Sequence, residues 1–143
     1  QRRMMEDVPK ADVVVTNPTH FAVALRYDTA QAPAPLLVAK GSDLVALRIR
    51  ELALEHTVPV VSAPLLARAL YHTTEIGGQV PQRLYVAVAQ VLAYVYRLRT
   101  AGREGGAPPP PLDPDALDVP EELARPPRGG APPPTEPAGD TRL

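Results

Sequence analysis

The distribution of proline most strongly limits where this chain can build a hydrophobic core. Twelve of its 19 prolines lie between Pro108 and Pro137, and no aromatic residue follows Tyr96. Such segments bury too little apolar surface to offset the conformational entropy lost on folding, so they form polyproline II or stay disordered. We therefore predict one globular domain over residues 10–100 and a disordered proline-rich tail over residues 101–143, with at most a transient turn between Leu112 and Leu123. The alternative for the tail is a ligand for a proline-binding groove.

Composition narrows the class of protein further. The length of 143 residues suits one domain, and the absence of cysteine excludes disulfides and thiolate metal sites. The three histidines are too far apart for a metal-binding motif, so we expect no metal and no cofactor. A formal net charge of −1 gives no indication of a nucleic-acid partner. No apolar run is long enough to span a bilayer and no signal peptide is apparent. Because the chain starts at Gln1 rather than Met, we expect a fragment of a longer protein or a processed product.

Residues 10–100 carry alternating strand and helix patterns. β-branched and apolar runs predict strands, and apolar residues at helical spacing predict helices. Ser42 is placed to cap the first of these helices, whose leucines on opposite faces suggest burial on both sides. We predict a small α/β domain with a mixed sheet of about four strands and a parallel crossover between the last two. The predicted strands are Val13–Thr16, Phe21–Tyr27, Leu36–Ala39 and Val58–Val61, and the predicted helices span Asp43 to about His56, Leu65 to about Tyr71, and about 83–99.

The tetrapeptide Asn17-Pro18-Thr19-His20 lies between the first two predicted strands. Asn-Pro is a common turn dipeptide, so an ordinary turn, or a bend within one strand, is the simplest interpretation. The complete tetrapeptide is rarer, and it has a chemical consequence. Because proline has no N–H, the backbone attack that deamidates asparagine is closed. The side-chain amide nitrogen of Asn17 can instead attack its own carbonyl carbon, form a succinimide and release Pro18 as a new N-terminus.

Each residue of the tetrapeptide has a candidate role in this reaction. Asn17 is the nucleophile, and Pro18 supplies the leaving amine through a tertiary amide with a weaker planar preference. Thr19 shapes the turn by hydrogen bonding. His20 either positions the loop or moves a proton, since imidazole titrates near neutral pH, and a purely structural histidine is equally compatible with the sequence.

Two further groups of residues are candidate sites. The segment from Lys40 to Asp43 resembles a phosphate-binding helix start, but it lacks a glycine-rich loop, so helix capping is the preferred interpretation. Arg48, Arg50 and Arg68 suggest a basic docking surface, with solvated helix faces as the simpler alternative. No convergent set of acid, base and nucleophile supports a small-molecule enzyme.

The chain resembles the cytoplasmic domain of the FlhB/YscU family, the substrate-specificity switch proteins of flagellar and virulence type III secretion systems. The resemblance covers roughly residues 8–100 and leaves out the proline-rich tail. It is carried by residues 11–25 around the tetrapeptide and by short stretches further along the chain. Of these, residues 24–28, Lys40-Gly41 and Ser62-Ala63-Pro64 resemble the flagellar branch more than the injectisome branch.

The resemblance implies a fold, an activity and a location. The fold is a sheet of four strands surrounded by helices, with the Asn17-Pro18 turn exposed and cut by the protein itself in a single turnover. Residues 1–9 would end a linker helix from an absent membrane region, at the cytoplasmic face of the bacterial inner membrane. The implied partners are the export gate cytoplasmic domain, the hook-length control protein and export substrates. The implied function is switching of export substrate specificity. The alternative is a constitutive docking domain of a virulence type III secretion system.

Overall fold

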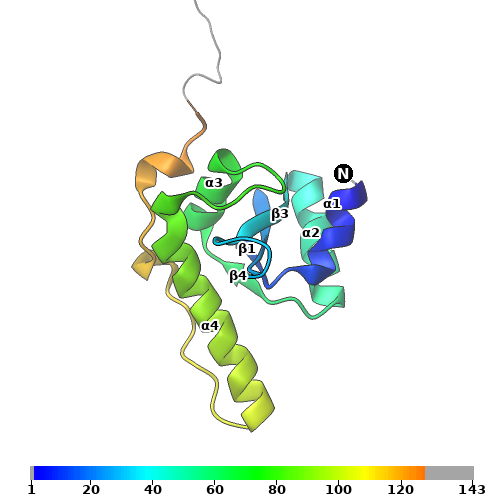
Figure 1. The fold of residues 1–143 in the computed structure, drawn as a ribbon, viewed down its shortest axis with the longest axis vertical. Helices are drawn as coiled ribbons and strands as arrows, with labels where there is room; N and C mark the ends of the chain where they lie inside the picture. The colour runs from blue at the N-terminus through cyan, green and yellow to red at the C-terminus, as the bar shows by residue number, and fades with distance from the viewer. Residues whose placement is uncertain (1, 128–143) are drawn as a thin grey trace, which may run out of the picture.

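A computed structural model describes residues 2–127, and the predicted disorder of residues 128–143 lies outside that range. A four-stranded mixed sheet lies between helices on both faces (Figure 1). The α/β fold class is therefore confirmed. The strands are β1 (Val13–Asn17), β2 (Phe21–Arg26), β3 (Leu36–Ser42) and β4 (Val60–Ser62), and the helices are α1 (Arg2–Asp7), α2 (Asp43–Glu55), α3 (Pro64–Thr73) and α4 (Tyr85–Glu104).

The sheet has the strand order β3-β2-β1-β4. β1 and β2 form an antiparallel hairpin in which Asn17 is paired with Phe21, so the alternative of a single bent strand is excluded. β2 pairs antiparallel with β3, and β1 pairs parallel with β4. The predicted crossover is present, because β3 and β4 run in the same direction at opposite edges. β1 is therefore an interior strand, with hydrogen-bonded neighbours on both sides.

Strand alternation divides the core between the two faces of the sheet. Val13 and Val15 of β1 face α3 and α4, whereas Val14 faces α1 and α2. All three valines are fully buried. Such burial of a strand on both faces requires the continuous apolar run seen in the sequence. The α2 face is lined largely by alanines, so α2 packs close to the sheet; these are Ala22, Ala24, Ala39, Ala46 and Ala53.

Two of the predicted strand boundaries were wrong by two or more residues. β3 does not stop at Ala39 but continues through Lys40 and Gly41 to Ser42. The glycine is a packing requirement rather than a breaker, because a Cβ there would lie 2.2 Å from Val45 Cγ1. β4 begins at Val60, two residues later than predicted.

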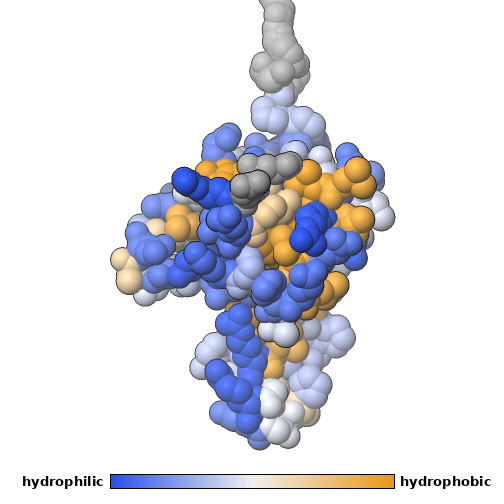
Figure 2. Space-filling view, turned by 90° about the vertical axis from the view of Figure 1, so that its right-hand side faces the viewer, coloured by the Kyte–Doolittle hydropathy of each residue, from blue (hydrophilic) through white to orange (hydrophobic). Residues whose placement is uncertain are grey.

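The outer face of α2 corrects a second expectation. Burial of this helix on both sides was predicted, but only Ala46, Ile49 and Ala53 are buried. Figure 2 shows apolar side chains among hydrophilic ones on the face of the molecule that carries α1 and α2. The large apolar side chains of α2 that are exposed are Leu44, Leu47 and Leu54.

The segment after α4 differs from the predicted disorder as far as residue 127. α4 extends to Glu104, and the chain then returns alongside it to α3 (Figure 1). Leu117 and Ala124 are buried in the core on that face, with Leu112, Val119 and Leu123 packed around them. Gln90 of α4 donates to the Ala116 carbonyl and accepts from the Asp118 N–H. The high proline content of this stretch predicted disorder, but its few apolar residues pack against the core.

The N-terminal residues also pack against the domain. The buried side chain of Met4 in α1 lies at the edge of β3, where its sulfur accepts a hydrogen bond from the Lys40 N–H. Val8, in the 3₁₀ turn Val8–Lys10, is fully buried. Among the helices of residues 2–127, none has the length and apolar character needed to cross a membrane.

Candidate functional site at the β1–β2 turn

The Asn-Pro peptide bond lies at the start of a tight turn. The His20 N–H donates to the Asn17 carbonyl at 2.9 Å, which closes a four-residue β-turn. Thr19, the third residue, has φ of 72°. A positive φ at the third position with proline at the second identifies a type II turn, since proline excludes the type I′ alternative. The predicted hairpin turn is thus present, with the Asn17 carbonyl as its acceptor.

Thr19 occupies a conformation that its side chain disfavours. Position three of a type II turn normally holds glycine, because an L-residue there brings Cβ close to the following carbonyl. The left-handed region costs a non-glycine residue about 1–2 kcal/mol, and β-branching makes it rarer still. Such a conformation persists only where the surroundings impose it.

Backbone hydrogen bonds hold the chain on both sides of the turn. On the β1 side, the Thr16 carbonyl accepts from the Ala63 N–H at 2.9 Å. On the β2 side, the His20 carbonyl accepts from the Asp43 N–H at 3.0 Å. The turn therefore lies between two anchors, one from Ala63, which follows β4, and one from the start of α2.

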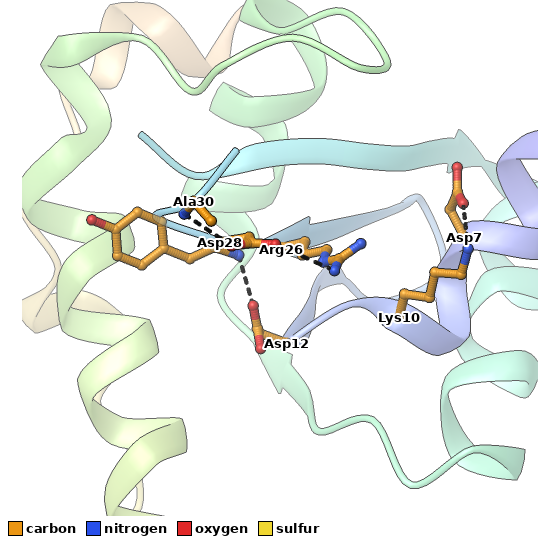
Figure 3. Close-up of polar contacts among 7 residues, drawn as sticks. Asp7, Lys10, Asp12, Arg26, Asp28 and Ala30 are labelled. Atoms are coloured by element: carbon orange, nitrogen blue, oxygen red, sulfur yellow. Dashed lines mark hydrogen bonds and ion pairs between the residues drawn. The ribbon is translucent and has the colours of Figure 1, made fainter. Parts of the chain in front are cut away.

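Side chains secure the opposite, open end of the same hairpin. The Asp12 carboxylate, labelled in Figure 3, accepts a hydrogen bond from the Tyr27 N–H at 2.6 Å. The same figure shows Asp28, which accepts from the Ala30 N–H and pairs with Arg26 at 3.5 Å. Asp12 also lies 3.8 Å from Arg99 of α4, so charged groups fasten this end to the rest of the domain.

An aromatic cluster supports the first residue after the turn. The ring of Phe21 stacks on Tyr71 with centroids 4.3 Å apart and meets His72 edge-on at 5.6 Å. Lys40 donates to the carbonyls of Tyr71 and Thr74 at 2.8 Å each, so it binds the last turn of α3. Burial, together with Lys40 and Arg68 nearby, lowers the pKa of His72 below its usual 6.5. Phe21 is therefore fixed by long-range packing that the sequence did not reveal.

The four predicted site residues are together, but their side chains do not form a catalytic cluster. Asn17 is half-buried, while Pro18, Thr19 and His20 are exposed. Within residues 2–127, neither the Asn17 amide nor the His20 imidazole makes a hydrogen bond. The backbone of His20, in contrast, is engaged at both its N–H and its carbonyl. Sequence analysis missed Asp43 as a contact of the turn, because nothing local links residues 20 and 43.

The other candidate sites fare differently. Lys40 is engaged with α3, so the segment from Lys40 to Asp43 presents no lysine for a phosphate. Ser42 does stand at the N-cap position of α2, but its side chain makes no capping hydrogen bond. Arg48 pairs with Glu51 and Glu55 on its own helix.

The three arginines of the predicted basic surface do not come together. Arg48 and Arg50 lie on α2, and Arg68 lies on α3, which covers the other face of the sheet. Arg50 instead lines a groove of about 350 Å³ beside the turn, with Thr19, Phe21, Asp43, Leu44, Ala46 and Leu47 as the other lining residues.

Comparison with known proteins places this architecture in a family. The model of the FlhB HrpN YscU SpaS family matches residues 1–95. The flagellar biosynthetic protein FlhB of Salmonella typhimurium is 60% identical over 123 residues, which are 86% of this chain and 32% of that protein. FlhB of Bacillus subtilis is 53% identical over 98 residues, 68% of this chain and 27% of that protein. The chain thus spans about a third of the length of the relatives it matches.

Solved structures give the same result. The cytoplasmic domain of FlhB from Shewanella putrefaciens superposes with a TM-score of 0.79 at 50% identity, covering 85% of this chain and 93% of that one. A mutated EscU C-terminal domain gives a TM-score of 0.63 at 32% identity, covering 66% and 95%. Sequence, fold and the Asn-Pro turn agree, and the chain belongs to the FlhB HrpN YscU SpaS family.

Proposed function

We propose that this domain cuts its own backbone between Asn17 and Pro18. The observation that carries the proposal is the geometry of the turn, in which a hydrogen-bond donor is already directed at the carbonyl to be attacked. The His20 N–H lies 2.9 Å from that oxygen. A donor fixed on the oxygen stabilises the negative charge that develops when a nucleophile adds to the carbonyl carbon.

The covalent steps balance without an outside reagent other than water. The side-chain nitrogen of Asn17 forms a bond to its own carbonyl carbon and loses a proton. The bond from that carbon to Pro18 breaks, and the prolyl nitrogen leaves as a secondary amine carrying the proton. Water then opens the succinimide, which leaves asparagine or isoasparagine at the new C-terminus. The net reaction is hydrolysis of one peptide bond, once per molecule.

The anchored strands favour this reaction in two ways. They hold nucleophile and carbonyl within a single residue in a fixed turn, and such proximity lowers a barrier by several kcal/mol. The left-handed conformation of Thr19 stores about 1–2 kcal/mol, which is available once the chain opens.

Intact mass spectrometry of the purified chain tests the proposal. We expect two pieces, ending at Asn17 and starting at Pro18, that co-elute under native conditions and separate only in denaturant. Asn17→Ala removes the nucleophile and should remain a single chain. A wild-type chain that stays whole at neutral pH would sink the proposal.

At the level of the whole protein, we propose a component of the flagellar protein export apparatus that takes part in switching substrate specificity. The relatives named above are flagellar biosynthetic proteins, and the Shewanella domain is described as cytoplasmic. By the same analogy, this domain would face the cytoplasm below a membrane region that residues 1–9 join to it. The export gate, the hook-length control protein and the export substrates are its proposed partners.

The competing proposal is a constitutive docking domain of a virulence system. The identities favour the flagellar assignment, at 60% for Salmonella FlhB against 32% for EscU. The profile of exported proteins in a strain carrying Asn17→Ala separates the two roles. A block in the change from hook-type to filament-type export supports switching, whereas an unchanged profile supports docking.

A further inference from the structure

We propose that Asp43 is a positioning residue for the cleavage, acting through the backbone of His20. The inference rests on the proposed self-cleavage and assigns a role to a residue 26 positions beyond the cut. The Asp43 N–H donates to the His20 carbonyl at 3.0 Å, and the His20 N–H donates to the Asn17 carbonyl at 2.9 Å. The hydrogen bond from Asp43 therefore holds His20, whose own N–H binds the Asn17 carbonyl.

The backbone conformation of Asp43 is unusual in the same way as that of the turn. Within residues 2–127, three non-glycine residues have a positive φ, namely Thr19 at 72°, Asp43 at 52° and Thr57 at 56°. Two of these three are joined through His20. Aspartate accepts a left-handed φ more readily than most residues do.

Packing around the end of β3 fixes Asp43 in place. Gly41 allows Val45 to approach so closely that a Cβ at residue 41 would clash at 2.2 Å. Ser42, the residue before Asp43, is paired with Phe21 across the β2–β3 ladder. Phe21 is held in turn by the stacked ring of Tyr71. The donor at Asp43 therefore belongs to a rigid frame, while the turn it contacts is exposed.

This arrangement gives Asp43 a specific task in the reaction. When Asn17 attacks its own carbonyl, the oxygen must keep its donor while negative charge grows. An exposed turn with a strained Thr19 would relax if only its strands held it. The bond from Asp43 keeps His20 from rotating, so the donor stays aimed at the oxygen. The side chain of Asp43 has no part in this, and the relevant group is its backbone N–H.

An amide-to-ester replacement tests the role of that N–H. Incorporating the α-hydroxy acid of aspartate at position 43 during cell-free translation of residues 1–143 removes the donor and keeps the side chain. The rate of cleavage is followed by the appearance of the two pieces on denaturing gels. We expect a slowing of about tenfold, smaller than the hundredfold or more that follows direct loss of an oxyanion donor.

A matched control separates positioning from general stability. The same ester replacement at Val58 removes the hydrogen bond from its N–H to the Ala53 carbonyl, at 2.8 Å, near the other end of α2. The melting temperatures of both esters are measured in the Asn17→Ala background. The proposal predicts slowing for the ester at Asp43 and not for the ester at Val58, at comparable loss of stability. Equal slowing of both, or of neither, would overturn it.

Ordinary substitutions provide a second, independent comparison. Asp43→Gly keeps the N–H and accepts a positive φ, so its cleavage rate should stay close to that of the wild type. Asp43→Val also keeps the N–H, but a β-branched residue resists the left-handed region and should slow cleavage. Equal rates for these two variants would contradict the proposal. A wild-type chain that does not cut would instead refute the self-cleavage itself, so the two failures are distinguishable.

Discussion

The two ends of the β1–β2 hairpin are held by different means. At the open end, the carboxylate of Asp12 accepts from the Tyr27 N–H and pairs with Arg99. At the closed end, backbone hydrogen bonds to Thr16 and His20 and the packing of Phe21 surround a threonine in a left-handed conformation. Charged side chains thus fasten the open end, whereas no charged side chain of residues 2–127 holds the closed end, where the main chain is strained.

This difference indicates which end can change without loss of the fold. In the proposed cleavage, breaking the main chain at the turn would relieve strain and leave the anchors on both sides intact. The valines of β1, which are buried in the uncut chain, and the contacts of Asp12 do not involve the broken bond. In the proposed cleavage the reacting bond lies at the strained end of the hairpin, and the four predictions below address this difference and the packing around it.

The largest effect is expected where the two pieces are held together. Leu25 is fully buried in β2, and Leu25→Ala should cost about 2–5 kcal/mol by leaving a cavity. A cut chain lacks the covalent turn, so the same cavity should dissociate it while an Asn17→Ala chain remains folded. Thermal unfolding and size-exclusion chromatography of both backgrounds measure this. Equal behaviour of the two would show that the covalent turn contributes nothing to holding the two pieces together.

A smaller loss is expected at the open end. Asp12→Ala removes the acceptor of the Tyr27 N–H and the partner of Arg99, which should lower stability by about 1 kcal/mol. The rate of cleavage should not change, because the turn keeps its own hydrogen bonds. Asp12→Asn is the control, since its amide oxygen still accepts from Tyr27. Urea unfolding and the cleavage time course report the two effects, and slower cleavage would argue that both ends act on the bond.

Relief of strain at the closed end should have the opposite sign. Thr19→Gly removes about 1–2 kcal/mol of strain, and the greater entropy loss of glycine offsets about 0.5–1 kcal/mol of that gain. In the Asn17→Ala background we expect a net stabilisation of about 0.5 kcal/mol by the same balance. Thr57→Gly relieves a similar conformation far from the turn. Only Thr19→Gly should slow cleavage. If Thr19→Gly and Thr57→Gly cleave at the same rate, strain at Thr19 does not contribute to the reaction.

The smallest effect concerns pH. Burial, Lys40 and Arg68 lower the pKa of His72 in the folded state from 6.5. The unfolded chain then binds a proton more readily, so stability is complete above pH 6.5 and falls as the pH drops toward the lowered value. His72→Gln should flatten the dependence of the melting temperature on pH in this range. An unchanged slope would assign the dependence to other groups.

Sequence patterns were sufficient where the determinants are local. The run from Val13 to Thr16 predicted β1, because β-branched residues without polar alternation form doubly buried strands. The Asn17-Pro18 turn was predicted from the same stretch. The outer face of α2 was not, since Leu47 and Leu54 have the spacing of a second buried face and remain exposed. Periodicity reports which residues share a face, not whether another element covers it.

The parts that failed depend on contacts between distant segments. Proline content suggested disorder from residue 101, and it does not reveal that Leu117 finds a surface on the core. The anchor from Asp43 to His20 depends on the register of β2 and β3, which no single segment determines. The stacking of Phe21 on Tyr71 is of the same kind. The local sequence identified the Asn17-Pro18 bond, whereas the contacts that hold the turn depend on how distant segments pair and pack.

The interior position of β1 has a consequence for what a cut can accomplish. After cleavage, residues 1–17 would form a separate peptide whose strand sits between β2 and β4 of the larger piece. That peptide could not leave without dividing the sheet in two, and residues 2–127 contain no further strand to close the gap. The reaction would change the number of chains while leaving every neighbour in place. The cut would then be an irreversible covalent change that lasts for the lifetime of the folded protein.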